Sequence, residues 1–200
     1  MGNYSINGGI IGACNTPANS KQVTSFTSSG CFNRTMPTGT AIVIAGGGGG
    51  SFGGAGAGGV IVVECHPFPS CAVPITIGAG GASVTANNCD KGTDGNNSVW
   101  GGPAPLTALK GMGGGGPNAA PVFPIDAGLY GSGGGAGGCN PAEGGKGSHP
   151  GSYGGCTPTY QGSPGGRASN RAAGGGGACN LGQGMGTGGA EGTSNGGQGR

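Results

Sequence analysis

The sequence predicts a mainly β protein in which a small N-terminal β-sheet or sandwich carries a disulfide-stapled, glycine-rich helix bundle, with almost no α-helix. Three observations predict this class. Glycine supplies 57 of the 200 residues, and all but six of these glycines lie at or beyond Gly46. Short runs of β-branched residues gather before about residue 100. No stretch shows a sustained helical period of apolar residues.

The N-terminal arm is apolar around Ile10 and Ile11, which are candidate interface residues. An exposed apolar arm can insert as an extra strand into a neighbouring subunit. Along the whole chain we expect three regions, which are the arm (residues 1–20), a β-rich region (residues 21–100) and a glycine-rich bundle (residues 101–200) packed with residues 46–59 as one unit.

The strand signals lie in the β-rich region. Residues 22–33, QVTSFTSSGCFN, alternate around a Ser-Ser-Gly turn and predict a hairpin. The strongest strands are rich in Val and Ile and bounded by Gly or Pro, and they are residues 40–45, 59–64 and 73–78. Four or five short strands of this kind predict a small sandwich or sheet. The loop between residues 65 and 71 is stiffened by proline.

From about Gly101 onward, glycine segments recur between short stretches of Pro, Asn and Cys, which favour turns. We expect these segments to be polyglycine-II helices, the glycine form of the extended polyproline-II helix with three residues per turn. Helices without side chains can approach until backbone groups hydrogen-bond between them. Glycine is then required wherever a residue faces another helix, and Ala, Ser, Asn, Met and Tyr can occupy outward or edge positions.

Two other glycine-rich classes are excluded. Collagen requires glycine at every third position, whereas Gly46–Gly50 is an uninterrupted run. A disordered linker normally depends on charge to stay solvated, but charged residues make up only 7% of this chain and its net charge is +2.

The eight cysteines are spread along the whole chain. Their even number, in a chain poor in core-forming side chains, predicts disulfides made in an oxidising, extracellular setting. Pairs of near neighbours are favoured, namely Cys65 with Cys71 and Cys139 with Cys156. The disulfide candidates are Cys14, Cys31, Cys65, Cys71, Cys89, Cys139, Cys156 and Cys179.

No catalytic or cofactor-binding site is predicted, and we do not expect an enzyme. The six Asp and Glu residues are scattered, there are only two histidines, and no nucleophile–base signature is present. Basic residues do not cluster, so nucleic-acid binding is not expected. No segment approaches the roughly 20 apolar residues that span a membrane.

No metal site is predicted either. Cys65, His66 and Cys71 offer zinc ligands without the C-x-x-C spacing, so a disulfide is the simpler interpretation. The stretch from Asp90 to Asn96 is faintly similar to a calcium loop, but glycine stands where the terminal Glu is required, which favours a plain turn.

Four aromatic residues lie at or between glycine segments, and they are Trp100, Tyr130, Tyr153 and Tyr160. As candidate interface residues they can grip a protein or a sugar. The alternative is that they cover the ends of the bundle as a small satellite core.

Six motifs follow one another in a fixed order: FTSSGCF (26–32), AIVIAGGGGG (41–50), GAGGVIVVE (56–64), ITIGAGG (75–81), NNSVWGG (96–102) and LKGMGGGG (109–116). This succession resembles the glycine-rich domain of phage tail-fibre tips and large bacterial surface proteins. The resemblance implies a β-rich base that carries a sandwich of polyglycine-II helices, in adhesive or structural extracellular proteins.

We therefore expect an extracellular structural protein whose partner is itself, as a homo-oligomer or a helical polymer in a filament or surface appendage. Unpaired strand edges offer backbone hydrogen bonds to the next subunit, and a contact between unlike surfaces propagates into a polymer. The alternative is a tail-fibre tip adhesin on a virion, binding a cell-surface receptor or glycan. An ice-binding protein is a third, weaker alternative.

Overall fold

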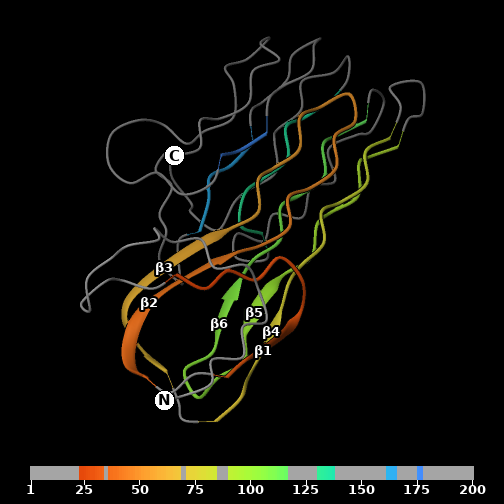
Figure 1. The fold of residues 1–200 in the computed structure, drawn as a ribbon. Coiled ribbons are helices and arrows are strands. Elements are labelled where there is room, and N and C mark those ends of the chain that lie inside the picture. The colour runs from red at the N-terminus through yellow and green to blue at the C-terminus, as the bar shows by residue number, and fades with distance from the viewer. Residues whose placement is uncertain are drawn as a thin grey trace, which may run out of the picture.

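The structure is a computed structural model, and it describes residues 23–33, 36–68, 71–84, 90–116, 130–137, 161–165 and 175–177. Within these residues the fold is mainly β and contains no helix (Figure 1). The strands are, in chain order, β1 (Gly30–Phe32), β2 (Met36–Ile44), β3 (Val60–Phe68), β4 (Val73–Thr76), β5 (Ser98–Trp100) and β6 (Leu106–Ala108).

The described strands form two layers around one core. β1, β4, β5 and β6 make an antiparallel four-stranded sheet in that order, and β2 and β3 make a long antiparallel ribbon that packs against β5 and β6. The three strongest predicted strands are confirmed in β2, β3 and β4. The core residues are Phe32, Ala41, Ala45, Ile61, Val73, Ile75, Trp100, Leu106 and Ala108.

The ribbon carries two register shifts. Glu64 and Cys65 of β3 both lie opposite Thr40 of β2, and Cys65 has a φ of 54°. An extra residue in one strand bends a ribbon and increases its twist. Pro37 lies at the second shift, a position that suits a residue with no N–H to donate to the ladder.

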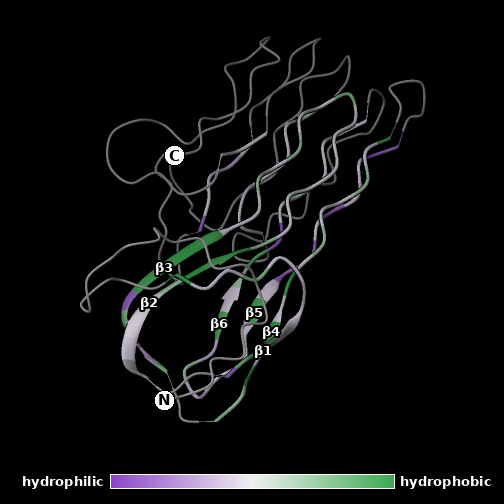
Figure 2. Ribbon diagram, viewed as in Figure 1, coloured by the Kyte–Doolittle hydropathy of each residue, from purple (hydrophilic) through white to green (hydrophobic). Residues whose placement is uncertain are grey.

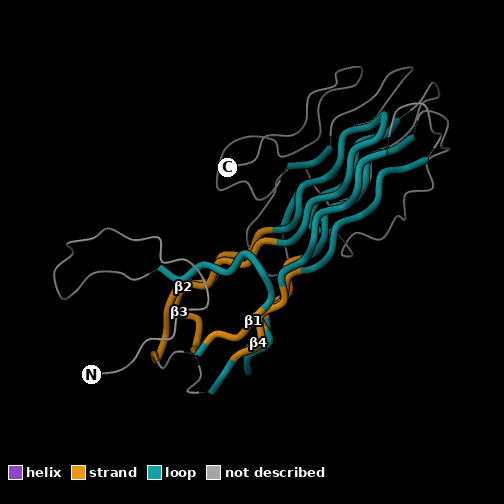
Figure 3. Tube along the Cα trace, turned by 45° about the vertical axis from the view of Figure 1, so that its right-hand side comes forward, coloured by secondary structure: helices purple, strands orange, loops and turns teal. Residues whose placement is uncertain are grey.

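The strands continue directly into the glycine-rich segments, which extend side by side beyond one end of the sheets (Figure 3). β2 runs into residues 45–50, and residues 53–59 return to β3. The N–H of Ala45 donates to the carbonyl of Gly59 at 3.0 Å, so the ribbon ladder passes without a break into this pair of segments. The boundary expected near residue 100 falls inside the β5–β6 hairpin.

Residues 111–116 form the centre of the glycine-rich half, and all six are buried. Their backbone bonds repeat every three residues: neighbouring donors point to different segments, and the donor three residues later returns to the first segment. The donor–acceptor pairs are Gly111–Gly46, Met112–Ser132, Gly114–Gly49 and Gly115–Gly135. Because one segment bonds to several surrounding segments, this arrangement differs from a β-strand, which bonds only within the plane of its sheet.

Close approach of the segments requires glycine at particular positions. A Cβ on Gly49 would lie 1.9 Å from the carbonyl oxygen of Ala82, and a Cβ on Gly46 would lie 2.0 Å from that of Ala79. A Cβ on Gly47 would meet no atom closer than 3.7 Å, which is ordinary van der Waals contact. Backbone contact therefore requires glycine at residues 46 and 49 but not at residue 47.

The hairpin predicted for residues 22–33 is wrong. Within the described part of this stretch, Gly30–Phe32 is the only strand of the sheets, and its partner is β4. Phe26 packs edge-on against Phe32, with ring centroids 6.4 Å apart, so burial of two aromatic rings takes precedence over local strand pairing.

The loop predicted between residues 65 and 71 is also shorter than expected. β3 continues to Phe68, and the pairing of Pro67 and Phe68 with β2 holds this stretch extended. Cys65 and Cys71 are free and exposed, so the predicted disulfide between them is wrong; Cys31 is free as well. The remaining candidates lie outside the described residues, and they are Cys14, Cys89, Cys139, Cys156 and Cys179.

Although Met and Tyr can occupy outward positions, two of these residues lie in the interior. Met112 is fully buried in the central segment, and Tyr130 is 7% exposed. A flexible, unbranched methionine fills irregular gaps between packed elements. The tyrosine hydroxyl donates a hydrogen bond to the half-buried carboxylate of Asp94.

A pair of alanine substitutions tests the contact pattern. Gly49→Ala should lower the free energy of unfolding by at least about 2 kcal/mol, because a methyl group forced against backbone must displace a whole segment. Gly47→Ala should change it by less than about 0.5 kcal/mol, since the space there is open. Chemical denaturation of both variants measures the difference, and equal losses would contradict the pattern.

Candidate assembly surface

The β2–β3 ribbon is apolar on both faces. Its inner face places Ile61 in the core with no exposed surface. On its outer face Ile42 lies opposite Val62 and Ile44 opposite Val60, and the two isoleucines are 62% and 59% exposed. Figure 2 shows the hydrophobic colouring of both strands in the half of the ribbon nearest the glycine-rich segments. Strands that are apolar on both faces are typical of sheets covered on both sides.

β2 is also an edge strand. Among the described strands it pairs only with β3. An edge strand presents unpaired N–H and C=O groups along its free side, and these can accept a further strand. Exposed isoleucines and an unpaired edge therefore occur on the same strand.

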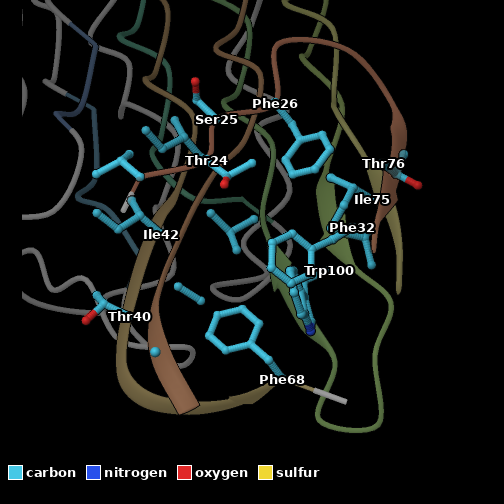
Figure 4. A pocket seen from close by; sticks show the side chains of 16 residues that line it. Thr24, Ser25, Phe26, Phe32, Thr40, Ile42, Phe68, Ile75, Thr76 and Trp100 are labelled. Atoms are coloured by element: carbon cyan, nitrogen blue, oxygen red, sulfur yellow. The ribbon is translucent and has the colours of Figure 1, made fainter. Parts of the chain in front are cut away.

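A cavity of about 450 Å³ lies between β2 and the four-stranded sheet. In Figure 4 the rings of Phe26, Phe32, Phe68 and Trp100 gather on one side of β2, whereas Ile42 points away from them. The cavity is lined by residues 23–26 and 39–44 and by Phe32, Phe68, Ile75, Thr76, Val99 and Trp100. We refer to this cavity as the groove.

The aromatic wall of the groove is closely packed. Phe32, Phe68 and Trp100 have ring centroids 5.1–5.4 Å apart. His66 packs edge-on against Trp100 at 5.5 Å, and desolvation by burial lowers its pKa, so the imidazole is neutral at pH 7. Mutual packing holds these rings in place, and the groove is therefore preformed and apolar.

A charged cluster joins three of the glycine-rich segments. The carboxylate of Asp94 accepts hydrogen bonds from the Lys91 ammonium at 2.8 Å, the Gly113 N–H at 2.9 Å and the Tyr130 hydroxyl at 2.9 Å. Lys110 lies 3.5 Å from the same carboxylate and 5.1 Å from the centroid of the Tyr130 ring. The side chain of Asp94 therefore supplies the partner that the Gly113 N–H would otherwise need from a backbone.

The cluster shifts two pKa values in opposite directions. Burial alone would raise the pKa of Asp94, but the hydrogen bonds from Gly113, Lys91 and Tyr130 outweigh it and lower the pKa. Burial, together with the hydrogen bond to Asp94, raises the pKa of Tyr130 to about 12. Both groups thus keep their neutral-pH protonation states over a wider pH range in the folded chain.

The structure places the sequence-predicted interface residues in different settings. Trp100 and Tyr130 are each only 7% exposed, which favours the alternative that they belong to a small covering core, and their interface role stays a prediction. The other four candidates lie outside the described residues, and they are Ile10, Ile11, Tyr153 and Tyr160. The exposed isoleucines of β2 were missed, although the unbroken runs AIVI and VIVV are a signal of strands covered on both faces.

The described residues contain neither a cluster of metal ligands nor a membrane-spanning helix. No three His, Cys, Asp or Glu side chains lie together as a set of metal ligands in this part of the chain. The same residues include no helix with the length and apolar character needed to cross a membrane.

Comparison with known proteins gives one match. A family model described as a glycine-rich domain matches residues 27–200. The match includes all the described strands and glycine-rich segments, and only residues 23–26 of the described chain precede it. No curated protein and no solved structure matches the chain.

The lowered pKa of Asp94 predicts acid sensitivity. Its contribution to stability is present above the ordinary carboxyl pKa and is lost as pH falls through the lower pKa of the folded state. Asp94→Asn should therefore be less stable than wild type at pH 7 and lose less stability on acidification. Urea denaturation between pH 2 and pH 7 measures this, with the exposed Asp90→Asn as a control that should keep the wild-type profile.

The raised pKa of Tyr130 predicts that the folded chain loses stability at alkaline pH. The unfolded chain releases this proton near pH 10 and the folded chain near pH 12, so stability falls as pH rises between these values. Tyr130→Phe should lose less stability than wild type over the same interval, as followed by urea denaturation. Identical alkaline profiles would show that the hydroxyl is not held as described.

Proposed function

Because the chain belongs to the family of glycine-rich domains, we propose that it is a structural subunit that assembles with copies of itself into an extracellular filament or surface appendage. The extracellular location is part of this proposal and rests on the even number of cysteines in the sequence, although the three that the structure describes, Cys31, Cys65 and Cys71, are free.

The outward face of the ribbon carries this proposal. Ile42 and Ile44 are more than half exposed, and with Val60 and Val62 they form one apolar surface next to the edge of β2 with which no other described strand pairs. Complete burial of such a side chain is worth about 1.5–3 kcal/mol. We propose that the covering subunit meets this face through a different surface of its own, because contacts of that type extend into a polymer unless the ring closes, whereas a contact between two identical faces would stop at a dimer.

The glycine-rich half supports the proposal as a stiff, side-chain-poor stalk. We propose that its segments are polyglycine-II helices. A helix with three residues per turn directs successive N–H groups about 120° apart, so the repeat of three in the backbone bonds of residues 111–116 is the pattern expected for it. Every segment is then tied to several others, which resists bending in all directions.

Assembly should depend on the ribbon face. Wild-type chain should form polymers above a threshold concentration, visible by electron microscopy and as fast sedimentation. The double variant Ile42→Thr with Ile44→Thr should raise that threshold at least about tenfold, because threonine keeps the strand preference and removes apolar area.

Phe52→Thr is the matched control. Phe52 is 40% exposed and lies at the turn between residues 45–50 and 53–59, at the end of these segments away from the ribbon. Its substitution should leave the threshold unchanged. Wild-type chain that stays monomeric at every concentration would contradict self-assembly and leave adhesion as the alternative.

A further inference from the structure

One strand position is unfilled in the described layers. The ribbon has two strands and packs on β5 and β6, whereas the sheet below it has four. The groove lies beside β2 and is floored by Phe32 of β1 and Ile75 of β4, the strands that the ribbon does not cover. Neighbouring strands lie about 4.8 Å apart and packed layers about 10 Å apart, so the groove lies where a third strand of the upper layer belongs.

The N-terminal arm has the sequence pattern of such a strand. Between Asn3 and Ile10 the apolar residues Tyr4, Ile6 and Ile10 all lie at even positions, with Gly8 at the fourth even position, and the odd positions carry polar residues or glycine. Alternation of this kind is typical of a strand with one buried and one solvated face. The stretch from residue 4 to residue 10 is as long as β2 between Thr38 and Ile44, and the arm joins the described chain at Val23, which itself lines the groove.

We propose that the groove is the acceptor site for the N-terminal arm of a second copy, which adds a strand to the free edge of β2. Tyr4, Ile6 and Ile10 enter the groove against Phe32 and Trp100, and the alternating polar residues face solvent. Main-chain bonds to the edge provide affinity and the apolar side chains set the register. The donor is a second copy because this inference rests on the proposed self-assembly: an arm that filled its own groove would close the surface rather than join two subunits.

The donor can be identified by crosslinking between isotopically distinct chains. Full-length chain carrying a benzophenone side chain at position 6 is mixed in equal amounts with its ¹⁵N-labelled form, assembled and irradiated. We expect crosslinks from position 6 to residues of β2 or the groove, with about half of them joining a light chain to a heavy chain. Crosslinks only within one isotopic form would show that the arm fills its own groove and would overturn the proposal.

A charge placed on either face of the arm tests the register. Ile6→Asp should raise the threshold concentration for assembly at least about tenfold. Ser5→Asp adds the same charge at a solvated position and should assemble as wild type. Unchanged thermal unfolding of the unassembled chains verifies that both variants fold.

The outcomes separate this inference from the proposed function. Wild-type chain that never assembles overturns both. Assembly of wild type and Ile6→Asp at the same threshold overturns the arm alone, because subunits then join through another surface. An equal effect of Ser5→Asp and Ile6→Asp would overturn the insertion of Ile6 into an apolar groove.

Discussion

Hydrogen bonds between backbones of neighbouring glycine-rich segments are the interaction on which the rest of the structure depends. Ordering a residue costs roughly 1–2 kcal/mol, and glycine loses the most conformational freedom. Residues 111–116 are buried with one side chain among them, that of Met112, so little apolar burial offsets this cost. The stabilising contribution that remains comes from the hydrogen bonds of these N–H groups, nearly all of which have a partner, and each bond contributes a net gain of about 0.5–1.5 kcal/mol. Such bonding needs the close approach that only glycine allows.

The sheets supply the alignment that these bonds require. Isolated glycine segments have no side-chain contacts to set their register, whereas the β2–β3 ladder passes its register to the segments through the bond from Ala45 to Gly59. Asp94 sets a second register by bonding Gly113 and Tyr130 from separate segments. The apolar sandwich and the charged cluster thus fix the positions of segments that glycine alone cannot specify, and they leave the ribbon face and the groove open at the other end.

Much of the β half could be predicted from the sequence, because AIVI, VIVV and PITI are strong local strand signals. β5 and β6 were not predicted, since SVW and LTA are too short to show alternation. The partner of β1 was predicted wrongly because β4 lies more than 40 residues away, and a contact at that distance leaves no local pattern in the sequence. For Trp100 and Tyr130 the sequence left an interface and a small core as alternatives, because the spacing of single aromatic residues does not distinguish a surface from a core. The role of Asp94 depends on partners up to 36 residues distant.

Amide hydrogen exchange of the native chain, resolved by residue, tests the backbone lattice most directly. The N–H groups of Gly46, Gly49, Gly111 and Gly114 each donate to a carbonyl of another segment and should exchange slowly, near the rate of the β2–β3 ladder. Gly47 lies among them in a half-buried position where a side chain would fit, and it should exchange much faster. Slow exchange at Gly46, Gly48 and Gly49 and throughout residues 111–115, with fast exchange at Gly47, would establish the lattice. Uniformly fast exchange through residues 46–50 and 111–116 would contradict it.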